Sequence, residues 1–302
     1  MNYDIIGDIH GHADELEKLL QKLGYHLSEG IYSHSEARKV IFLGDYIDRG
    51  PKIRETLHIV KNMCDNGNAE AIMGNHEYNA VCFDTKDTKN GGFYRKHSFV
   101  EIHQHYNTLK QFKDFTDEWK IFLNWFRELP LFIEKENFRA VHACWDDKHI
   151  NWIKQNYIGK LTNDFMALAA DKRTNEYVVI EETLKGKEVT VPTEGHFHDK
   201  DGTLRKRSRI KWWKPENGRR LNKDVMFCSP GFGNKEFTVE NIFIYNSEIP
   251  VFFGHYWLVE EPIIEMDQMA ICLDYSVAKE GKLVGYRSEY LNELSKNKGF
   301  VY

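Results

Sequence analysis

The sequence predicts an α/β fold, because short apolar segments alternate with amphipathic segments through its first half. The apolar segments end on Gly-Asp or Gly-Asn and are expected to be buried strands: residues 3–8 (YDIIGD), 38–45 (RKVIFLGD) and 70–75 (EAIMGN). The first two are followed by segments whose apolar residues recur at helical spacing. Strands that alternate with helices indicate a layered α/β architecture.

Two helices are predicted between these strands. In residues 12–25, leucines recur every three or four positions, and Gly24 suits a C-terminal cap. Residues 52–64 follow Pro51, which fits the first turn of a helix, and Gly67 lies beyond their end. The first half of the chain is therefore expected to repeat the order strand, loop, helix.

The second half is predicted to combine helices, further strands and one insertion. Residues 94–128 have a helical and aromatic character, and residues 131–145 are expected to form a hairpin. Residues 146–225 are more polar and contain helical segments, the segment EVTVP and a basic run, so we interpret them as an insertion in a single domain that spans 1–302. Later strands are expected at 249–257, 269–277 and 281–291.

Composition excludes some classes of function. The 302 residues are 41% hydrophobic and 14% aromatic, which is enough to fill a sizeable core, and the net charge of -5 shows no overall basic excess for nucleic acid. We expect no membrane span, because no window has the roughly 18 apolar residues that a span needs. The first residues resemble no signal peptide, and the five cysteines are scattered without CxxC spacing, so a cytoplasmic location is expected.

Polar side chains follow five apolar segments, and four of these five sets come directly after a glycine. One buried histidine could be an ordinary core residue, but buried Asp and His are costly unless they are paired or bound to metal. Five sets at strand ends predict a site, since strand ends converge on the ligand crevice of an α/β sheet. The residues are Asp8, His10, Asp45, Asp48, Arg49, Asn75, His76, His142 and His255.

The chemistry of this set favours metal ions. It combines carboxylate, imidazole and amide oxygen atoms and contains no thiolate, which suits Mn²⁺, Fe or Zn²⁺ better than a structural cysteine–zinc site. Two such ions close together polarise a phosphoryl group for in-line attack, and a carboxylate can bridge them. The sequence therefore predicts a two-metal site.

The motifs GDIHG (7–11), GDYIDRG (44–50) and GNHE (74–77) resemble those of the calcineurin-like metallophosphoesterases. Within that family the chain is most similar to the phosphoprotein phosphatase branch, which includes bacterial and phage Ser/Thr phosphatases and diadenosine tetraphosphate hydrolases. The resemblance covers about the first 80 residues and resumes at 139–143 and 251–256. It implies a central β-sandwich of two mixed sheets flanked by helices, here with the helical and basic insertion.

The resemblance also implies a role for each site residue. Asp8 and His10 would bind one metal ion, Asp45 would bridge both, and the second ion would be bound by Asn75, His142 and His255. His76 would be the general acid, oriented by Asp48, and Arg49 would hold the substrate phosphate. We expect Mn²⁺, with Fe, Zn²⁺ or Ni²⁺ as alternatives. The expected reaction is hydrolysis of phosphomonoesters by direct attack of metal-bound hydroxide, as in a protein phosphatase.

Other interpretations stay open at this point. The substrate could instead be a dinucleoside polyphosphate such as diadenosine tetraphosphate, a nucleotide or an RNA end, and a catalytically silent binding module is a further alternative. The basic run 205–223 surrounds Trp212 and Trp213 and could bind nucleic acid or polyphosphate, or it could be a solvated face. The motif HQH (103–105) could add metal ligands. The candidates for a second phosphate-binding arginine are Arg209, Arg205 and Arg207.

Overall fold

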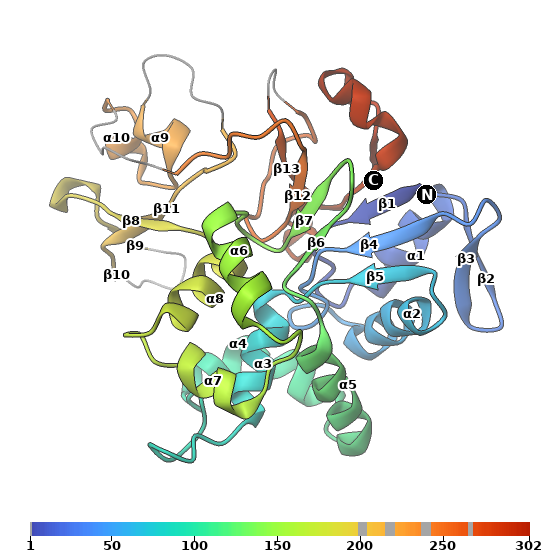
Figure 1. Cartoon of the computed structure of the whole chain (residues 1–302), viewed down its shortest axis with the longest axis horizontal. Coiled ribbons are helices and arrows are strands. Elements are labelled where there is room, and N and C mark those ends of the chain that lie inside the picture. Colours follow the sequence, from blue (N-terminus) through green and yellow to red (C-terminus); the bar gives the residue numbers. More distant parts are fainter. Residues whose placement is uncertain (1, 199–203, 215–220, 237–242, 265–267) are drawn as a thin grey trace.

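Two mixed β-sheets form the centre of the computed structural model, which describes residues 2–198, 204–214, 221–236, 243–264 and 268–302. The first sheet has the order β17-β16-β1-β4-β5: Phe300–Val301, Gly285–Arg287, Tyr3–Ile6, Lys39–Phe42 and Ala69–Ala71. The second has the order β13-β12-β7-β6: Ala270–Cys272, Val251–Phe253, Arg139–Val141 and Phe132–Glu134. Figure 1 shows the two sheets side by side at the middle of the molecule. The predicted fold class is confirmed.

Parallel pairing lies at the centre of each sheet. Strand β1 is parallel to β4, and β4 is parallel to β5, whereas β16 and β17 add antiparallel edges. In the second sheet β12 is parallel to both β7 and β13, and β6 is antiparallel to β7. Parallel neighbours end at the same edge, so the loops after β1, β4, β7 and β12 can form one site.

The alternation of side chains along each strand produces two apolar layers. Ile5 and Ile41 from the first sheet share one buried cluster with Phe252 and Ile271 from the second. The neighbouring residue Ile6 faces the other way, into the larger cluster that the helices cover. The inner faces therefore hold the sandwich together while the outer face of the first sheet carries helices.

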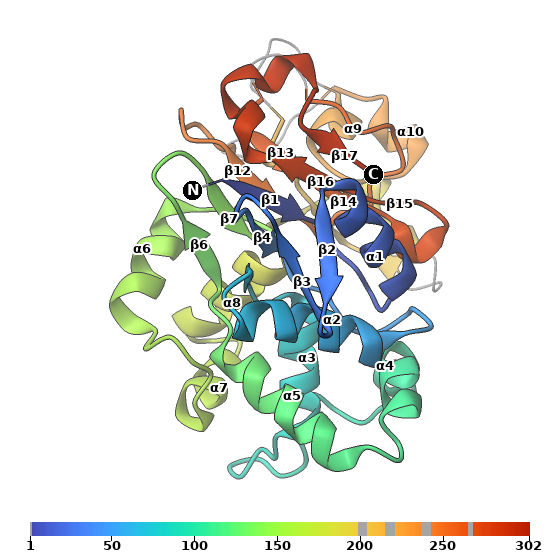
Figure 2. The same ribbon diagram turned by 90° about the vertical axis from the view of Figure 1, so that its right-hand side faces the viewer.

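The helices flank the sandwich largely as the sequence predicts. Helix α1 (Ala13–Lys22) and helix α2 (Ile53–Asp65) follow β1 and β4. Helices α3 (Asn75–Asp84), α4 (Phe99–Gln111) and α5 (Thr116–Glu128) lie together on one side of the sheets in Figures 1 and 2. The predictions did not include α3, nor the hairpin of β2 (Tyr25–Ser28) and β3 (Ile31–His34).

The predicted insertion is built mainly from three helices and short strand pairs. The helices are α6 (Asp147–Asn156), α7 (Asn163–Ala169) and α8 (Asn175–Lys185). The strand pairs are β8 (Glu188–Thr190) with β11 (Arg207–Arg209) and β9 (Phe197–His198) with β10 (Leu204–Arg205). The short helices η1 (Thr193–Gly195) and α9 (Asn222–Val225) also belong to the insertion, and α10 (Pro230–Gly233) lies just beyond its predicted end. That these residues are an insertion in one domain stays a prediction.

The two tryptophans of the basic run are buried in the core and do not belong to an exposed basic face. Trp212 is 0% exposed and Trp213 is 5% exposed. The ring of Trp212 lies 4.6 Å from that of Phe253 in β12, and its Nε1 donates to the carbonyl of Ala143 at 2.9 Å. Residues 215–220 of the basic run lie outside the described residues.

The last part of the chain closes the first sheet. Strands β14 (Asp274–Tyr275) and β15 (Lys282–Leu283) pair across the short turn η2 (Val277–Lys279), and η3 (Ser288–Lys296) separates β16 from β17. Among the described residues, no helix has both the length and the apolar character to cross a membrane. All five cysteines are free.

Candidate active site

Polar side chains from both sheets meet at the carboxyl ends of the parallel strands. Asp8 lies just beyond β1 and Asp45 just beyond β4, both in the first sheet. His142 follows β7 directly, and His255 lies just beyond β12, both in the second sheet. All four side chains are buried. The stacking of the sheets therefore brings motifs far apart in sequence to one place.

Asn75 reaches the same place from a helix. Strand β5 ends at Ala71, and Asn75 is the first residue of α3, so the strand predicted for 70–75 is shorter than expected. The Oδ1 atom of Asn75 lies 3.1 Å from Nε2 of His142 and 2.7 Å from Nδ1 of His255. The helix start thus places an amide oxygen between two imidazoles.

Asp45 lies at the centre of the cluster. Its Oδ2 atom is 3.6 Å from Nε2 of His10, and its Oδ1 atom is 3.3 Å from Nε2 of His142. Two groups of possible metal ligands share this carboxylate: one adds His10 and His76, and the other adds His142 and His255. A shared carboxylate is the arrangement that a bridging ligand requires.

Three buried ligand atoms in this cluster have no hydrogen-bond partner within the part of the chain that the structure describes. They are Oδ1 of Asp8, Nε2 of His10 and Nε2 of His255. An unpaired polar atom in the interior costs free energy, so such an atom is expected to contact a water molecule or an ion. The donor set of carboxylate, imidazole and amide oxygen suits divalent cations. The residues therefore fit the two-metal site that the sequence predicts.

The lowered pKa values of two of the histidines, His10 and His255, are consistent with metal binding. Burial, assisted by nearby His76, lowers the pKa of His10 to about 3. Burial, assisted by Arg209, also lowers the pKa of His255 well below its ordinary value. Neutral imidazoles have the lone pair that coordination requires, so these two rings can bind a cation without first losing a proton.

The backbone at the site has a conformation that residues other than glycine rarely adopt. The angle φ is positive at each of five site residues: His10 (47°), Asp45 (54°), Asp48 (67°), Arg49 (68°) and His255 (76°). A left-handed conformation at such a residue costs on the order of 1–3 kcal/mol and is typical of functional sites. The turns are therefore better explained by the site than by the stability of the fold.

Two glycines provide the space that the closely packed site requires. A Cβ atom on Gly44 would lie 2.5 Å from the backbone nitrogen of Gly74, and one on Gly254 would lie 1.9 Å from Oδ1 of Asp8. Both distances are far inside van der Waals contact. A glycine before the polar group therefore keeps bulk away from the cluster.

Glu77 supports the loop of Asp45 and was missed by the sequence analysis. Its Oε2 atom accepts from the backbone N–H groups of Asp45 (2.9 Å) and Gly74 (3.0 Å), and its Oε1 atom accepts from that of Tyr46 (2.8 Å). The side chain is fully buried. The sequence did offer one signal for this role, the glutamate that ends the GNHE motif. A buried carboxylate needs several hydrogen-bond donors, which a neighbouring loop can supply.

Asp48 connects two histidines. Its Oδ2 atom lies 2.5 Å from Nδ1 of His76, and its Oδ1 atom lies 2.6 Å from Nδ1 of His105. The hydroxyl of Thr108 donates to the same Oδ1 at 2.6 Å. His105 belongs to the HQH motif considered above as a source of metal ligands. The structure corrects that idea for His105, since its Nδ1 contacts Asp48, which is outside both ligand groups.

The negative charge of Asp48 and the positive charge of His76 stabilise each other. Burial opposes the charge on Asp48, but His105 and His76 hold the pKa of its carboxyl well below the ordinary range. Burial also opposes the charge on His76, and there Asp45 and Asp48 outweigh it, so the pKa of His76 is raised. The arrangement therefore favours a protonated imidazole next to the Asp45 cluster.

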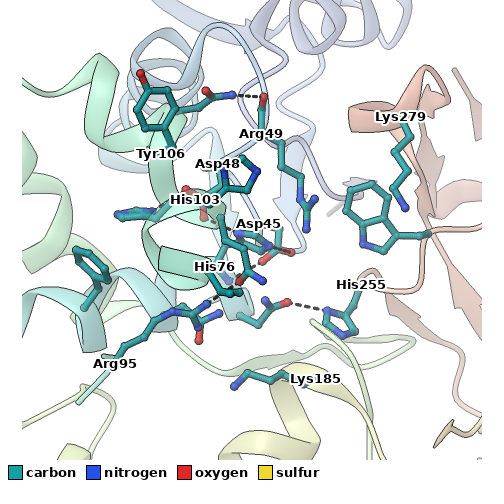
Figure 3. A pocket seen from close by; sticks show the side chains of 18 of the residues that line it. Asp45, Asp48, Arg49, His76, Arg95, His103, Tyr106, Lys185, His255 and Lys279 are labelled. Carbon is teal, nitrogen blue, oxygen red and sulfur yellow. Dashed lines mark hydrogen bonds and ion pairs between the residues drawn. The ribbon is translucent and has the colours of Figure 1, made fainter. Parts of the chain in front are cut away.

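A cavity of about 830 Å³ opens beside the cluster, and its lining is basic. Figure 3 shows Arg49 and Lys279 on one side of it and Arg95 and Lys185 across from them. Positive charge gathered around a cleft attracts anions. Its cationic lining residues are Arg49, Arg95, Lys185, Arg205, Arg209 and Lys279.

Two of the three candidate arginines lie at this cavity. Arg209 in β11 and Arg205 in β10 are both in its lining. Arg207 is not, and its Nε atom lies 3.7 Å from Oε2 of Glu188. The structure therefore keeps Arg209 and Arg205 as candidates for phosphate binding and removes Arg207.

Comparison with known proteins identifies a family match and several partial relatives. The family model described as calcineurin-like phosphoesterase matches residues 1–256. The bis(5'-nucleosyl)-tetraphosphatase PrpE of Oceanobacillus iheyensis is 32% identical over 179 residues, which are 59% of this chain and 64% of that protein. PrpE of Bacillus subtilis is 46% identical over 76 residues, 25% of this chain and 31% of that protein. The matches therefore span less than two thirds of these relatives.

Solved structures resemble the chain at low sequence identity. A cold-active protein-tyrosine phosphatase of a Shewanella species is 16% identical with a TM-score of 0.48, covering 95% of this chain and 74% of that chain. A protein serine/threonine phosphatase from Saccharomyces cerevisiae is 14% identical with a TM-score of 0.48, covering 95% of this chain and 72% of that chain.

Proposed function

We propose that this chain, which belongs to the calcineurin-like phosphoesterase family, is a metal-dependent phosphatase whose active site is the cluster around Asp45. The observation with the greatest weight is that Asp8, His10 and His255 each have a buried ligand atom without a hydrogen-bond partner among the residues that the structure describes. They surround a carboxylate that two groups of possible ligands share. The basic cavity supports the same proposal, because it suits an anionic substrate.

In this proposal six residues hold two divalent ions. Asp45 would be shared by both ions, and Mn²⁺ is the metal we expect. When bound, the ions polarise the phosphoryl group and lower the pKa of a water molecule. Asp8 and His10 would hold one ion, and Asn75, His142 and His255 would hold the other.

Arg49 and His76 act on the substrate itself. Arg49 is exposed in the cavity, and its planar guanidinium matches two phosphate oxygens. The Nδ1 atom of His76 is engaged by Asp48, so its Nε2 atom, 3.9 Å from Oδ2 of Asp45, is the one that holds the proton for the leaving oxygen. Asp48 orients the ring and favours its charged form.

Phosphomonoesters, including phosphoproteins, are the first substrate class that we propose. Dinucleoside polyphosphates are the second, and two observations favour them. Cationic side chains line the cavity from Arg49 across to Arg95, which pairs with Glu101, and Lys185, which pairs with Glu181, so the lining offers cations for more than one phosphate. The partial relatives named above are bis(5'-nucleosyl)-tetraphosphatases.

Hydrolysis of p-nitrophenyl phosphate tests the proposal. We expect activity that EDTA abolishes and that Mn²⁺ restores. Absence of turnover with every divalent metal tried would instead support a catalytically silent binding module. A parallel assay of a phosphopeptide panel, diadenosine tetraphosphate and 5'-phosphorylated RNA then ranks the substrate classes by kcat/KM.

A further inference from the structure

Two cations lie over one indole ring at the wall of the cavity. The guanidinium carbon of Arg49 is 4.4 Å from the ring centroid of Trp257, and Nζ of Lys279 is 4.2 Å from it. All three residues line the cavity. The negative face of an indole ring attracts cations, so the ring stabilises each positive charge beside it. Trp257 therefore holds a pair of positive charges at one place.

The segments that present Trp257 and Lys279 are joined by hydrogen bonds. The buried carboxylate of Asp274 accepts from the backbone N–H groups of Trp257 (2.7 Å) and Ser276 (3.0 Å). The hydroxyl of Ser276 donates to the carbonyl of Leu258 at 3.0 Å. Lys279 ends the turn η2, which begins directly after Ser276. The backbone thus fixes the position from which Lys279 reaches the ring.

We propose that Trp257 and Lys279 form a subsite for a second phosphate, adjacent to the phosphate that is hydrolysed. The inference rests on the proposed function in one respect, since Arg49 is taken to hold the phosphate being hydrolysed. Because Arg49 and Lys279 share one ring, the next phosphate of a polyphosphate chain lies beside the ammonium group of Lys279. A phosphomonoester has no such group. The subsite therefore adds affinity for the second proposed class, substrates that contain a chain of phosphates.

Lys282 provides a matched control on the same surface. It is also a lysine over an aromatic ring, with Nζ 4.3 Å from the ring centroid of Tyr302, and it pairs with Glu261 at 2.6 Å. It does not line the cavity. Removing the charge of Lys282 changes the net charge of the protein as much as removing that of Lys279. A difference in affinity between the two variants therefore reports the position of the lysine and not the change in net charge.

Calorimetric titration of the full-length, Mn²⁺-loaded protein tests the subsite. The probes are orthophosphate, inorganic tripolyphosphate and β,γ-methylene ATP. We expect Lys279→Gln to raise the Kd of both polyphosphates about 5- to 30-fold more than the Kd of orthophosphate, which is the effect of one charge-assisted hydrogen bond. Lys279→Arg should recover most of the affinity, and Lys282→Gln should leave all three Kd values within about twofold of wild type.

The same experiment has outcomes that overturn the subsite. The subsite is contradicted if Lys279→Gln changes the Kd of orthophosphate and that of tripolyphosphate equally, or changes neither. A loss confined to the methylene nucleotide would also contradict it, because it would show that Lys279 contacts another part of the nucleotide. Turnover of p-nitrophenyl phosphate on the same samples reports separately on the proposed function: selective polyphosphate binding without hydrolysis of any ester would retain the subsite and contradict the proposed function.

Discussion

The Nδ1 atom of His76 lies 2.5 Å from Oδ2 of Asp48, and both side chains are buried beside the Asp45 cluster. A carboxylate at this distance fixes the plane of the ring and determines which nitrogen remains for the substrate. The second oxygen of Asp48 is held in turn by His105 and Thr108. The proposed proton donor is therefore positioned by buried side chains from the loop after β4 and from helix α4.

Replacing His76 tests its role as the proton donor. We expect His76→Asn to lower kcat about 10²–10⁴-fold on phenyl phosphate, whose leaving group is poor and needs a proton. The metal content, measured by inductively coupled plasma mass spectrometry, should equal that of wild type. Loss of metal would show instead that His76 is a ligand, since it belongs to a ligand group with His10 and Asp45.

Replacing His105 tests whether it positions Asp48. We expect His105→Gln to lower kcat about 5- to 50-fold on phenyl phosphate, because the carboxylate that orients His76 loses one of its partners. The loss should be much smaller on 2,4-dinitrophenyl phosphate, whose leaving group needs no proton. Equal losses on both esters would indicate a structural role only. His58→Gln, at an exposed ion pair with Glu118, is the control and should leave both rates within about twofold of wild type.

Glu77→Gln tests the support of the Asp45 loop. The amide has one acceptor oxygen where the carboxylate has two, so at least one of the N–H groups of Asp45, Tyr46 and Gly74 loses its acceptor. We expect the free energy of unfolding to fall by about 1–3 kcal/mol in urea titrations. The affinity for Mn²⁺ should fall about 10- to 100-fold, as is typical when a residue behind the ligands is lost. Unchanged stability and affinity would contradict this role.

Asp146 gives the fold a predictable dependence on pH. Its carboxylate accepts from the backbone N–H of Lys148 at 2.8 Å and lies 2.9 Å from Nζ of Lys187. Burial opposes its charge, but Lys187 and the N–H group outweigh burial, so the pKa of Asp146 is lower in the folded protein than its ordinary value of 3.8. The folded state thus binds fewer protons, and the stability from Asp146 is present above the ordinary pKa and is lost as the pH falls through the folded pKa.

Asp146→Asn keeps the helix cap and removes the charge. We expect wild type to exceed this variant by about 1–3 kcal/mol in the free energy of unfolding at pH 7. The difference should persist to about pH 5 and shrink below about pH 4. Urea unfolding at pH 7, 5 and 3.5 measures it, and a difference that does not shrink at pH 3.5 would contradict the account.

The strands and site residues that the sequence could predict depend on local patterns of residues. Apolar segments bounded by glycine predicted β1 and β4, and the polar residues after them, Asp8 and Asp45, could be assigned to one edge because parallel strands share it. The roles of the ligands and of His76 remain predictions. The contact between His105 and Asp48 could not be predicted, because it depends on how α4 packs and not on any repeat in the sequence.

Tertiary packing also explains the failures. Trp212 and Trp213 lie among basic residues, which suggested either a binding face or a solvated face, yet packing on Phe253 in β12 buries both. The hairpin of β2 and β3 was missed because most of its side chains are exposed or half-buried. Its sequence therefore lacks the clear alternation of apolar and polar residues that predicts a strand.

Metal content measures the central claim most directly, namely that Asp45 joins two metal ions in one site. Wild type and Asp45→Asn are loaded with Mn²⁺, freed of excess by gel filtration and analysed by inductively coupled plasma mass spectrometry, with circular dichroism to show that both are folded. We predict about two equivalents of metal per chain in wild type and one or fewer in Asp45→Asn. Equal metal content in the two folded proteins, or none in wild type, would contradict the account.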